Sequence, residues 1–371
     1  MLAENIDDHD RSGRRVARSA AVNILNSLDR DAIIFVDGDN ATFPLWYVRE
    51  VEGIRRDVTV INLSYLSSPR YAATLLEAWD GSRPVPSSFS AGDMLYNALI
   101  SPSAREAADT IADALDAFER LRVDPQSRLG AKRLRVVLAP GDTAIIPVQT
   151  LSRSGKSLSP EFRKMMILDI VAANAASGNP RPIYWQSSIG GDMTVGLDRH
   201  LSPGLFAMRL GQLDDKAIDN EILRGVSKLE PYNDREDVYM DRVPASRLAT
   251  QRAALTRAIQ RLTRRHHTDE ALKTARFAMA ELSHHHDSYL AVRNADTLFL
   301  TGKEYASALR ELADTLRTHE ARTGARYGGV TAELCREADF TEARADSLRE
   351  AWHRYRNALP PRLRMKMVPS H

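Results

Sequence analysis

The chain opens with a helical pattern followed by a short apolar run. In residues 15–28, apolar side chains recur at the three- and four-residue spacing of a helix. Residues 31–36 follow, and from the second position on they are all apolar, with the β-branched and aromatic content of a strand. A run without polar alternation is typical of a strand covered on both faces, as in a parallel sheet. The pattern therefore predicts a helix and then a buried strand.

The same alternation of helices and strands continues as far as residue 185. Residues 42–47 open a second helical segment and place Pro44 in its first turn, where a proline is tolerated. Gly53 ends that segment, and the apolar run at 57–63 predicts a second strand. A strand, a helix and a strand in succession favour a right-handed crossover between parallel strands. Further along, the pattern predicts helices over 69–79, 104–121 and 160–174, strands over 133–139, 143–148 and 181–185, and a long loop over 81–103.

The C-terminal half has an almost entirely helical pattern. A period of about 3.6 residues recurs in five stretches, which lie at 243–265, 268–283, 287–300, 302–321 and 340–357. Their spacing of about 34 residues is similar to that of tetratricopeptide repeats, which are helical hairpins. The predicted fold class is an α/β domain with a mostly parallel sheet, followed by an all-α tetratricopeptide-like domain. We expect these domains over 1–240 and 241–358, and a loosely ordered tail over 359–371.

Composition and charge exclude several classes of protein. The 371 residues include one cysteine, Cys335, so neither an intrachain disulfide nor a zinc site of several cysteines can form. The chain has no stretch of about 18 uncharged apolar residues, and residues 1–15 are too charged for a signal peptide. From residue 241 on, 23 basic residues stand against 16 acidic ones, interleaved at helical spacing. Because nucleic-acid-binding surfaces cluster their basic residues, we expect no nucleic-acid partner.

The densest polar cluster follows the first predicted strand. Asp37, Gly38, Asp39 and Asn40 stand at its carboxyl end, which is where ligands bind in open α/β sheets. A glycine there allows close approach of the backbone, and Asp39 and Asn40 offer oxygen atoms to a cation or a sugar hydroxyl. The same residue types also cap helices and shape tight turns. Both interpretations, a ligand site and a helix cap, remain open at this point.

A second polar cluster lies near the N-terminus. Asp8, His9, Asp10 and Arg11 combine two carboxylates, an imidazole and a guanidinium. This mixture suits a metal site or a general acid–base pair. It also suits a solvated start of the helix that follows, and chain termini are often loosely ordered. We keep the cluster as a second candidate site.

Several ordered blocks of the sequence resemble one protein family. In the N-terminal region they are ENIDDHDRSGR at 4–14, GDNATFPLWY at 38–47, EVEGIRRDV at 50–58 and NLSYL at 62–66. Residues 168–174 and 181–185 match the same family further along. The family consists of large bacterial membrane proteins of unknown or glycosyltransferase-like function, similar to protein O-mannosyltransferases. The chain resembles its soluble region and its tetratricopeptide-like helical end.

The resemblance implies a molecule of two parts. A multi-pass membrane region would carry the lipid-sugar-dependent transferase centre, and the soluble region would follow it. We therefore expect the partner of this chain to be the membrane-embedded portion of the same protein or of a split subunit. The implied location is the cell envelope, on the periplasmic face of the inner membrane. We expect no catalysis from the isolated chain and name no catalytic residue.

The same resemblance bears on metals. The family usually has an acidic residue where this chain has Ala41, which argues against a metal role for the turn at 38–42. We expect no metal site and no cofactor.

Aromatic residues beside the turn suit carbohydrate recognition. Trp46 and Tyr47 follow it on one helix, and aromatic faces next to Asp and Asn side chains are usual components of a sugar-binding surface. Alternatively, both rings anchor the helix to the sheet as core residues. Arg55 and Asp57 are placed to pair across the turn at Gly53.

The leading hypothesis is a soluble, non-catalytic accessory domain of a glycosyltransferase-like membrane protein. It would recognise or position a peptide, protein or glycan acceptor. The candidate ligand-binding residues are Asp37, Asp39, Asn40, Thr42, Trp46, Tyr47 and Arg55. Two alternatives stay open: an independent carbohydrate- or nucleotide-sugar-binding enzyme that uses the Asp37–Asn40 turn, and an inert scaffold whose helical repeat binds partners.

Overall fold

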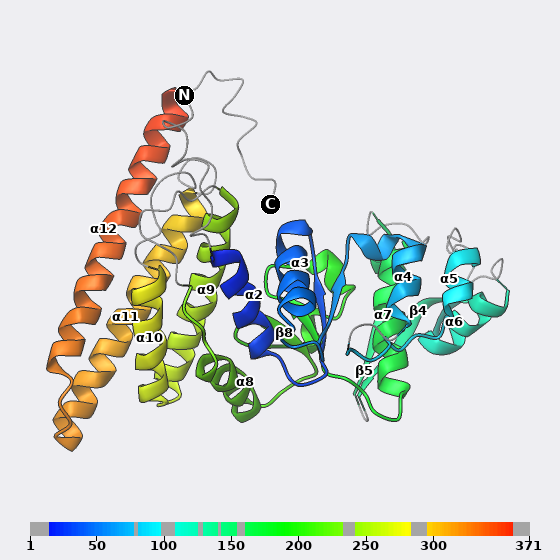
Figure 1. The fold of residues 1–371 in the computed structure, drawn as a ribbon, viewed down its shortest axis with the longest axis horizontal. Helices are drawn as coiled ribbons and strands as arrows, with labels where there is room; N and C mark the ends of the chain where they lie inside the picture. The colour runs from blue at the N-terminus through cyan, green and yellow to red at the C-terminus, as the bar shows by residue number, and fades with distance from the viewer. Residues whose placement is uncertain are drawn as a thin grey trace. The chain divides into compact units, whose positions relative to one another are not determined.

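Figure 1 shows the fold of the chain in a computed structural model. The structure describes residues 15–77, 81–97, 108–124, 129–139, 142–153, 160–232, 242–282 and 295–358. The chain divides into two compact units. One is the α/β unit, Ile24–Glu221, and the other is the helical unit, Met1–Asn23 together with Ile222–His371. Among the described helices, none is both long enough and apolar enough to cross a membrane.

The α/β unit is built on a five-stranded sheet of order β2-β1-β6-β8-β7. The strands are β1 (Ile33–Val36), β2 (Thr59–Asn62), β6 (Ile183–Gln186), β7 (Leu201–Pro203) and β8 (Ala207–Leu210). Strand β1 is parallel to both of its neighbours, whereas β8 is antiparallel to β6 and β7. All four residues of β1 are fully buried, which accounts for its unbroken apolar sequence. Strand β2 is outermost on its side of the described sheet.

A second, three-stranded sheet has the order β3-β4-β5. Its strands are β3 (Ala108–Asp113), β4 (Ala131–Ala139) and β5 (Asp142–Pro147). Strand β4 is parallel to β3 and antiparallel to β5. On β4, Leu134, Val136 and Leu138 are buried, while Arg135 and Val137 between them are exposed. This alternation shows that one face of the second sheet packs on the core.

Helices of the α/β unit connect and cover the strands. They are α3 (Asp39–Trp46), α4 (Pro69–Leu75), α5 (Ala91–Asn97), α6 (Ala114–Val123) and α7 (Phe162–Ala176). A π-helical turn, η1 (Tyr47–Val51), extends α3, and short 3-10 turns lie at η2 (Tyr65–Ser67), η3 (Val148–Leu151), η4 (Gly191–Thr194) and η5 (Asp198–His200). Helix α7 packs against β4 and α6 and contributes its buried residues to a core shared by both sheets.

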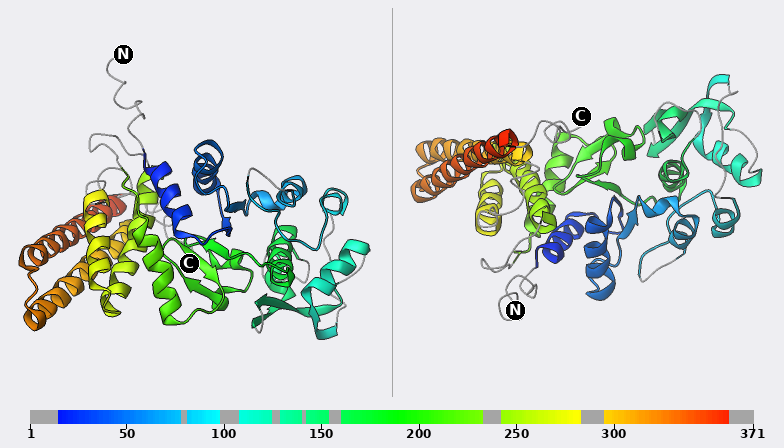
Figure 2. Two further views of the ribbon diagram at one scale, coloured as in Figure 1. Left: turned by 60° about the horizontal axis from the view of Figure 1, so that its bottom comes forward. Right: turned by 90° about the horizontal axis from the view of Figure 1, so that it is seen from above.

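The helical unit contains the long C-terminal helices. Helix α2 (Val16–Ser27) begins in this unit and ends in the α/β unit, and α8 (Asp215–Ser227) runs the other way. They are followed by α9 (Arg242–Arg264), α10 (Thr268–Leu282), α11 (Ala295–Thr323) and α12 (Gly328–Ala358). Figure 2 shows α11 and α12 as long helices running side by side, and Lys303 on α11 pairs with Glu342 (2.6 Å) and Asp346 (2.8 Å) on α12. Helix α9 packs on α10 and α11.

The structure confirms the predicted fold class, an α/β region followed by a region of mostly helices. The two sheets are mixed, because the pairings within the described residues comprise three parallel and three antiparallel ones. The expected domain boundary at residue 240 and the expected tail at 359–371 lie outside the described residues.

In the helical unit, the break expected between the stretches 287–300 and 302–321 is wrong, because α11 runs unbroken over Ala295–Thr323. Three local predictions in the α/β unit were also wrong. The helix expected over 104–121 begins only at Ala114, because Ala108–Asp113 pairs with β4 as strand β3. The carboxylate of Asp113 then accepts hydrogen bonds from the N–H groups of Leu115 (3.0 Å) and Asp116 (3.4 Å) and so caps α6. Within the expected loop over 81–103, α5 forms a short helix. Pairing with distant strands and side-chain caps decide these boundaries, and neither shows in local periodicity.

The third wrong prediction concerns Pro44. Helix α3 begins at Asp39, directly after Gly38, so Pro44 lies inside the helix and not in its first turn. Gly38 has φ 77° and ψ 155°, a conformation that only glycine adopts easily. This conformation turns the chain sharply after β1 and starts the helix several residues earlier than the proline indicates.

Candidate functional site

The candidate site lies where β1 and β2 end. Asp37 follows β1 directly, and Asp39 occupies the first turn of α3, where a carboxylate is favourable beside the helix N-terminus. A hydrogen bond stabilises the turn between β1 and α3, because the buried Thr42 hydroxyl donates to the Gly38 carbonyl at 2.9 Å. The parallel pairing of β1 and β2 brings the residues after β2 to the same edge of the sheet.

Hydrogen bonds join the two strand ends. Ser64 Oγ donates to Asp37 Oδ1 at 2.7 Å, and Tyr65 Oη donates to Asp39 Oδ1 at 3.0 Å. The hydrogen bond that Tyr65 donates to Asp39 raises the pKa of the Tyr65 hydroxyl above its usual value, since the neighbouring carboxylate stabilises the protonated form. Both Asp37 and Asp39 are exposed. Two carboxylates are thus held in place at the surface and keep oxygen atoms available to a ligand.

A buried amide supports this arrangement from below. Asn62, the last residue of β2, donates from Nδ2 to Thr42 Oγ1 at 2.8 Å and accepts the N–H of Tyr65 at 2.9 Å. Its own N–H donates to the Tyr71 hydroxyl oxygen at 2.9 Å. Asn62 therefore positions both the turn after β1 and the turn after β2, which keeps the exposed groups above it in a fixed geometry.

Four aromatic rings gather beside the carboxylates. Trp46 lies 5.9 Å from Phe43, 6.1 Å from Tyr65 and 6.3 Å from Tyr71, measured between ring centroids. Phe43 is 48% exposed and Tyr65 is 36% exposed. We define the aromatic–carboxylate cluster as Asp37, Asp39, Phe43, Trp46 and Tyr65. It combines exposed ring faces with acceptor oxygens on one surface.

The predicted ligand-binding residues divide between this cluster and other places. Asp37, Asp39 and Trp46 belong to the cluster, and Thr42 lies buried beneath it. Asn40 lies on α3 and is exposed. Tyr47 is 50% exposed, but among the described rings none stacks with it.

Arg55 lies away from the cluster and ties the start of β2 to α2. Its guanidinium donates to the carbonyls of Leu25 (2.5 Å), Leu28 (3.1 Å) and Asp29 (2.6 Å), which lie in the last turn of α2 and just after it. It also pairs with Asp57 at 2.8 Å, as the sequence predicts. Burial alone would raise the pKa of Asp57, but the bonds from Arg55 and from the Asp31 N–H hold it below the usual range. The structure gives Arg55 a role in the fold.

Sequence reasoning missed Phe43, Ser64, Tyr65 and Tyr71 as members of the site region. A signal for two of them exists, since Ser64 and Tyr65 follow the second strand as Asp37 follows the first. The ends of two parallel strands meet at one sheet edge, so the two segments are neighbours. The other candidate cluster, Asp8, His9, Asp10 and Arg11, lies outside the described residues.

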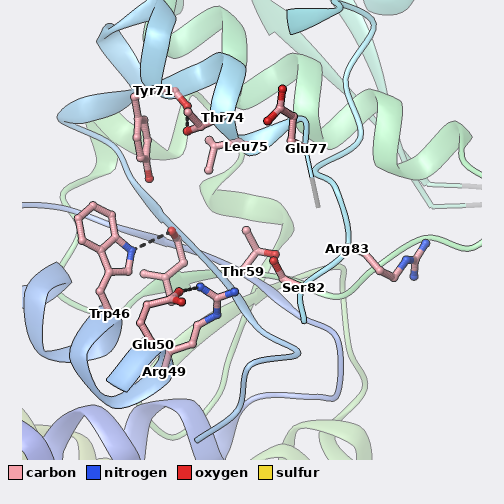
Figure 3. Close-up of a pocket in the computed structure, with 11 residues that line it drawn as sticks. Trp46, Arg49, Glu50, Thr59, Tyr71, Thr74, Leu75, Glu77, Ser82 and Arg83 are labelled. Atoms are coloured by element: carbon pink, nitrogen blue, oxygen red, sulfur yellow. Dashed lines mark hydrogen bonds and ion pairs between the residues drawn. The ribbon is translucent and has the colours of Figure 1, made fainter. Parts of the chain in front are cut away.

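A cavity of about 310 Å³ lies beside β2 and shares Trp46 with the cluster (Figure 3). We call it the β2-edge cavity, and it is lined by Trp46, Arg49, Glu50, Thr59, Val60, Tyr71, Thr74, Leu75, Glu77, Ser82 and Arg83. Trp46 Nε1 donates to the Val60 carbonyl at 3.4 Å, and Arg49 pairs with Glu50. Within the described residues, no three His, Cys, Asp or Glu side chains gather in a metal-binding arrangement.

Residues 17–152 match a family model described as TMEM260-associated domain 2. The match runs from α2 to the end of the second sheet, so it includes both the aromatic–carboxylate cluster and the β2-edge cavity. No curated protein and no solved structure matches the chain.

Proposed function

We propose that the chain is a non-catalytic accessory region of a glycosyltransferase-like membrane protein and that its α/β unit holds a glycan-bearing acceptor. The match of residues 17–152 to a TMEM260-associated domain supports the first part, because that description is of a domain associated with another protein. We place the chain at the cell envelope, on the periplasmic face, beside a membrane-embedded portion on the same protein or on a split subunit.

The aromatic–carboxylate cluster carries the second part of the proposal. Exposed faces of Phe43 and Tyr65 offer apolar surface to the C–H faces of a sugar ring. Asp37 and Asp39 stand next to them and accept hydrogen bonds from sugar hydroxyls. Because Ser64, Tyr65 and Asn62 already hold these groups in place, little conformational entropy is lost on binding.

Two substitutions test the cluster. We expect Phe43→Ala to weaken binding of an oligosaccharide ligand about two- to twelvefold, since one aromatic contact contributes about 0.5–1.5 kcal/mol. Asp39→Asn should cost about tenfold, because it removes a charged acceptor. Both residues are at the surface, so the melting temperature should change little. A glycan array identifies the ligand, and calorimetry with the best one gives the affinities.

The matched control is Phe340→Ala. Phe340 is 50% exposed, nearly the same as Phe43, but it lies on α12 in the helical unit. Its substitution should leave glycan affinity unchanged. If Asp39→Asn lowers only the melting temperature, Asp39 is a helix-capping residue and the cluster is not a binding site. Turnover of a nucleotide sugar or a glycoside by the isolated chain would favour the independent-enzyme alternative instead.

A further inference from the structure

The backbone of β2 presents to the β2-edge cavity a donor that has no acceptor among the described residues. Thr59 and Leu63 point their N–H groups at β1, where they donate to Ala32 (2.9 Å) and Val36 (2.8 Å). In a parallel ladder successive residues face opposite sides, so the N–H groups of Val60 and Asn62 point away from β1. The Asn62 N–H meets the Tyr71 hydroxyl, but the described residues include no acceptor for the Val60 N–H.

Two hydroxyl groups in the wall are also donors. Tyr71 Oη accepts the Asn62 N–H at 2.9 Å, and Thr59 Oγ1 accepts Arg181 Nη2 at 2.6 Å. Each oxygen is therefore already an acceptor and keeps a proton for which the described residues include no partner. Burial raises the pKa of Tyr71 to about 12, so its hydroxyl stays protonated at neutral pH. The inner wall thus offers donors, and a ligand that fits it must bring acceptors.

The remaining wall has an apolar part, and both of its arginines are paired. In Figure 3 the rings of Trp46 and Tyr71 lie together on one side of the cavity and Leu75 points into it. The Arg49 guanidinium faces the cavity but pairs with Glu50, and Arg83 pairs with Asp31 at 2.6 Å. An anionic ligand would meet no uncompensated cation there and would be repelled by Glu77, which also lines the cavity, so the wall favours a ligand without negative charge.

A ligand of this cavity therefore needs an acceptor for the donors, an apolar part for the rings and Leu75, and no negative charge. A small neutral group with an apolar end and a carbonyl oxygen has all three properties. We propose that the β2-edge cavity binds the acetamido group of an N-acetylhexosamine. The carbonyl oxygen of the acetamido group accepts the Val60 N–H, and its methyl group packs on Leu75 and Trp46. The Tyr71 hydroxyl donates to an oxygen atom of a substituent on the sugar ring. The sugar class rests on the proposed function, through Trp46, which belongs to both sites. The preference for an acyl group rests on the cavity alone.

The test compares two sugars that differ by the acetamido group. We expect N-acetylglucosamine to bind about tenfold tighter than glucose, because glucose leaves the Val60 donor without an acceptor. In a two-dimensional ¹⁵N NMR titration of the full chain, N-acetylglucosamine should shift the Val60 amide and the Trp46 indole signals. Equal affinity for the two sugars, or shifts that leave Val60 unmoved, would overturn the proposal.

Variants then assign the contacts. Tyr71→Phe removes the hydroxyl donor and should weaken N-acetylglucosamine binding about tenfold, with a thermal melt to check the fold. The control is Thr74→Val, one turn further along α4, whose hydroxyl is already bonded to the Tyr71 carbonyl at 2.7 Å; affinity should stay the same. An equal loss in both variants contradicts the assignment of the donor.

The same experiment separates this proposal from the proposed function. If Phe43→Ala leaves oligosaccharide binding intact while N-acetylglucosamine still outcompetes glucose, the surface cluster fails and the cavity proposal stands. If Phe43→Ala weakens oligosaccharide binding but the two monosaccharides bind alike, the reverse holds.

Discussion

Replacing Arg181 with methionine should lower the free energy of unfolding of the α/β unit by about 3–5 kcal/mol, because it leaves several buried acceptors unpaired. Arg181 is 3% exposed and lies just before β6. It donates to five oxygen atoms, which are the carbonyls of Asp31 (2.8 Å), Ala32 (3.2 Å), Arg83 (3.0 Å) and Pro84 (3.4 Å) and the hydroxyl of Thr59 (2.6 Å). One side chain thus joins the starts of β1, β2 and β6 to the segment after α4.

Urea denaturation followed by tryptophan fluorescence gives the free energy. Desolvation lowers the pKa of Arg181 to about 10, but the group remains a cation at neutral pH and keeps all its donors. Arg83→Met is the matched control: its guanidinium is substantially exposed and pairs with the same Asp31, so the loss should be below about 1 kcal/mol. A loss of that small size for Arg181→Met would show that Arg181 does not fasten the strands.

Residues such as Arg181 mark the limit of what the sequence predicts. The buried strand β1 follows from its unbroken apolar run, and the parallel pairing with β2 follows from the strand–helix–strand order. The five acceptors of Arg181, however, come from three segments that are far apart in the chain, and no local pattern connects them. An arginine before a proline looks the same at an exposed turn as at a buried junction.

The candidate site is also predictable from the sequence only in part. Asp37 and Asp39 stand out because they follow a predicted strand, and Asp39 and Trp46 also lie in the block at 38–47 on which the family resemblance rests. Tyr65 is exposed and would pass for an ordinary loop residue without the hydrogen bond that it donates to Asp39. The donor-rich wall of the β2-edge cavity needs the register of β2, which tells which N–H groups point outward. Sequence periodicity gives the existence of a strand but not that register.

The segment expected to be a long loop is in fact fastened by two buried charges. Arg181 binds the carbonyls of Arg83 and Pro84, and Asp169 on α7 binds Ser87 and Ser88. The same segment supplies Ser82 and Arg83 to the wall of the β2-edge cavity. Substitution of either charge should therefore affect the cavity as well as stability, so binding measurements on these variants must be made under conditions where the chain is folded.

The second large effect is a dependence of stability on pH that comes from Asp169. Its carboxylate is fully buried and accepts hydrogen bonds from Ser87 Oγ, Ser88 Oγ and the Ser88 N–H (3.1 Å). Desolvation raises its pKa from 3.8 to about 6, against the lowering effect of these bonds. Between these two values the folded chain holds a proton that the unfolded chain has released. Stability from this group is therefore fully present below pH 3.8 and is lost as the pH rises through 6.

Asp169→Asn removes this titration and keeps the shape of the side chain. The difference in unfolding free energy between the two chains should change by about 2 kcal/mol between pH 4 and 7, with the wild type losing stability relative to the variant. Asp93→Asn is the control, because bonds from Ser90 hold the pKa of Asp93 below its usual 3.8 despite partial desolvation. Asp93 therefore changes its protonation on folding only below about pH 4. The difference in unfolding free energy between wild type and Asp93→Asn should stay constant between pH 4 and 7. Urea denaturation at each pH gives the unfolding free energies. Parallel pH profiles of wild type and Asp169→Asn would mean that Asp169 does not change its protonation state on folding.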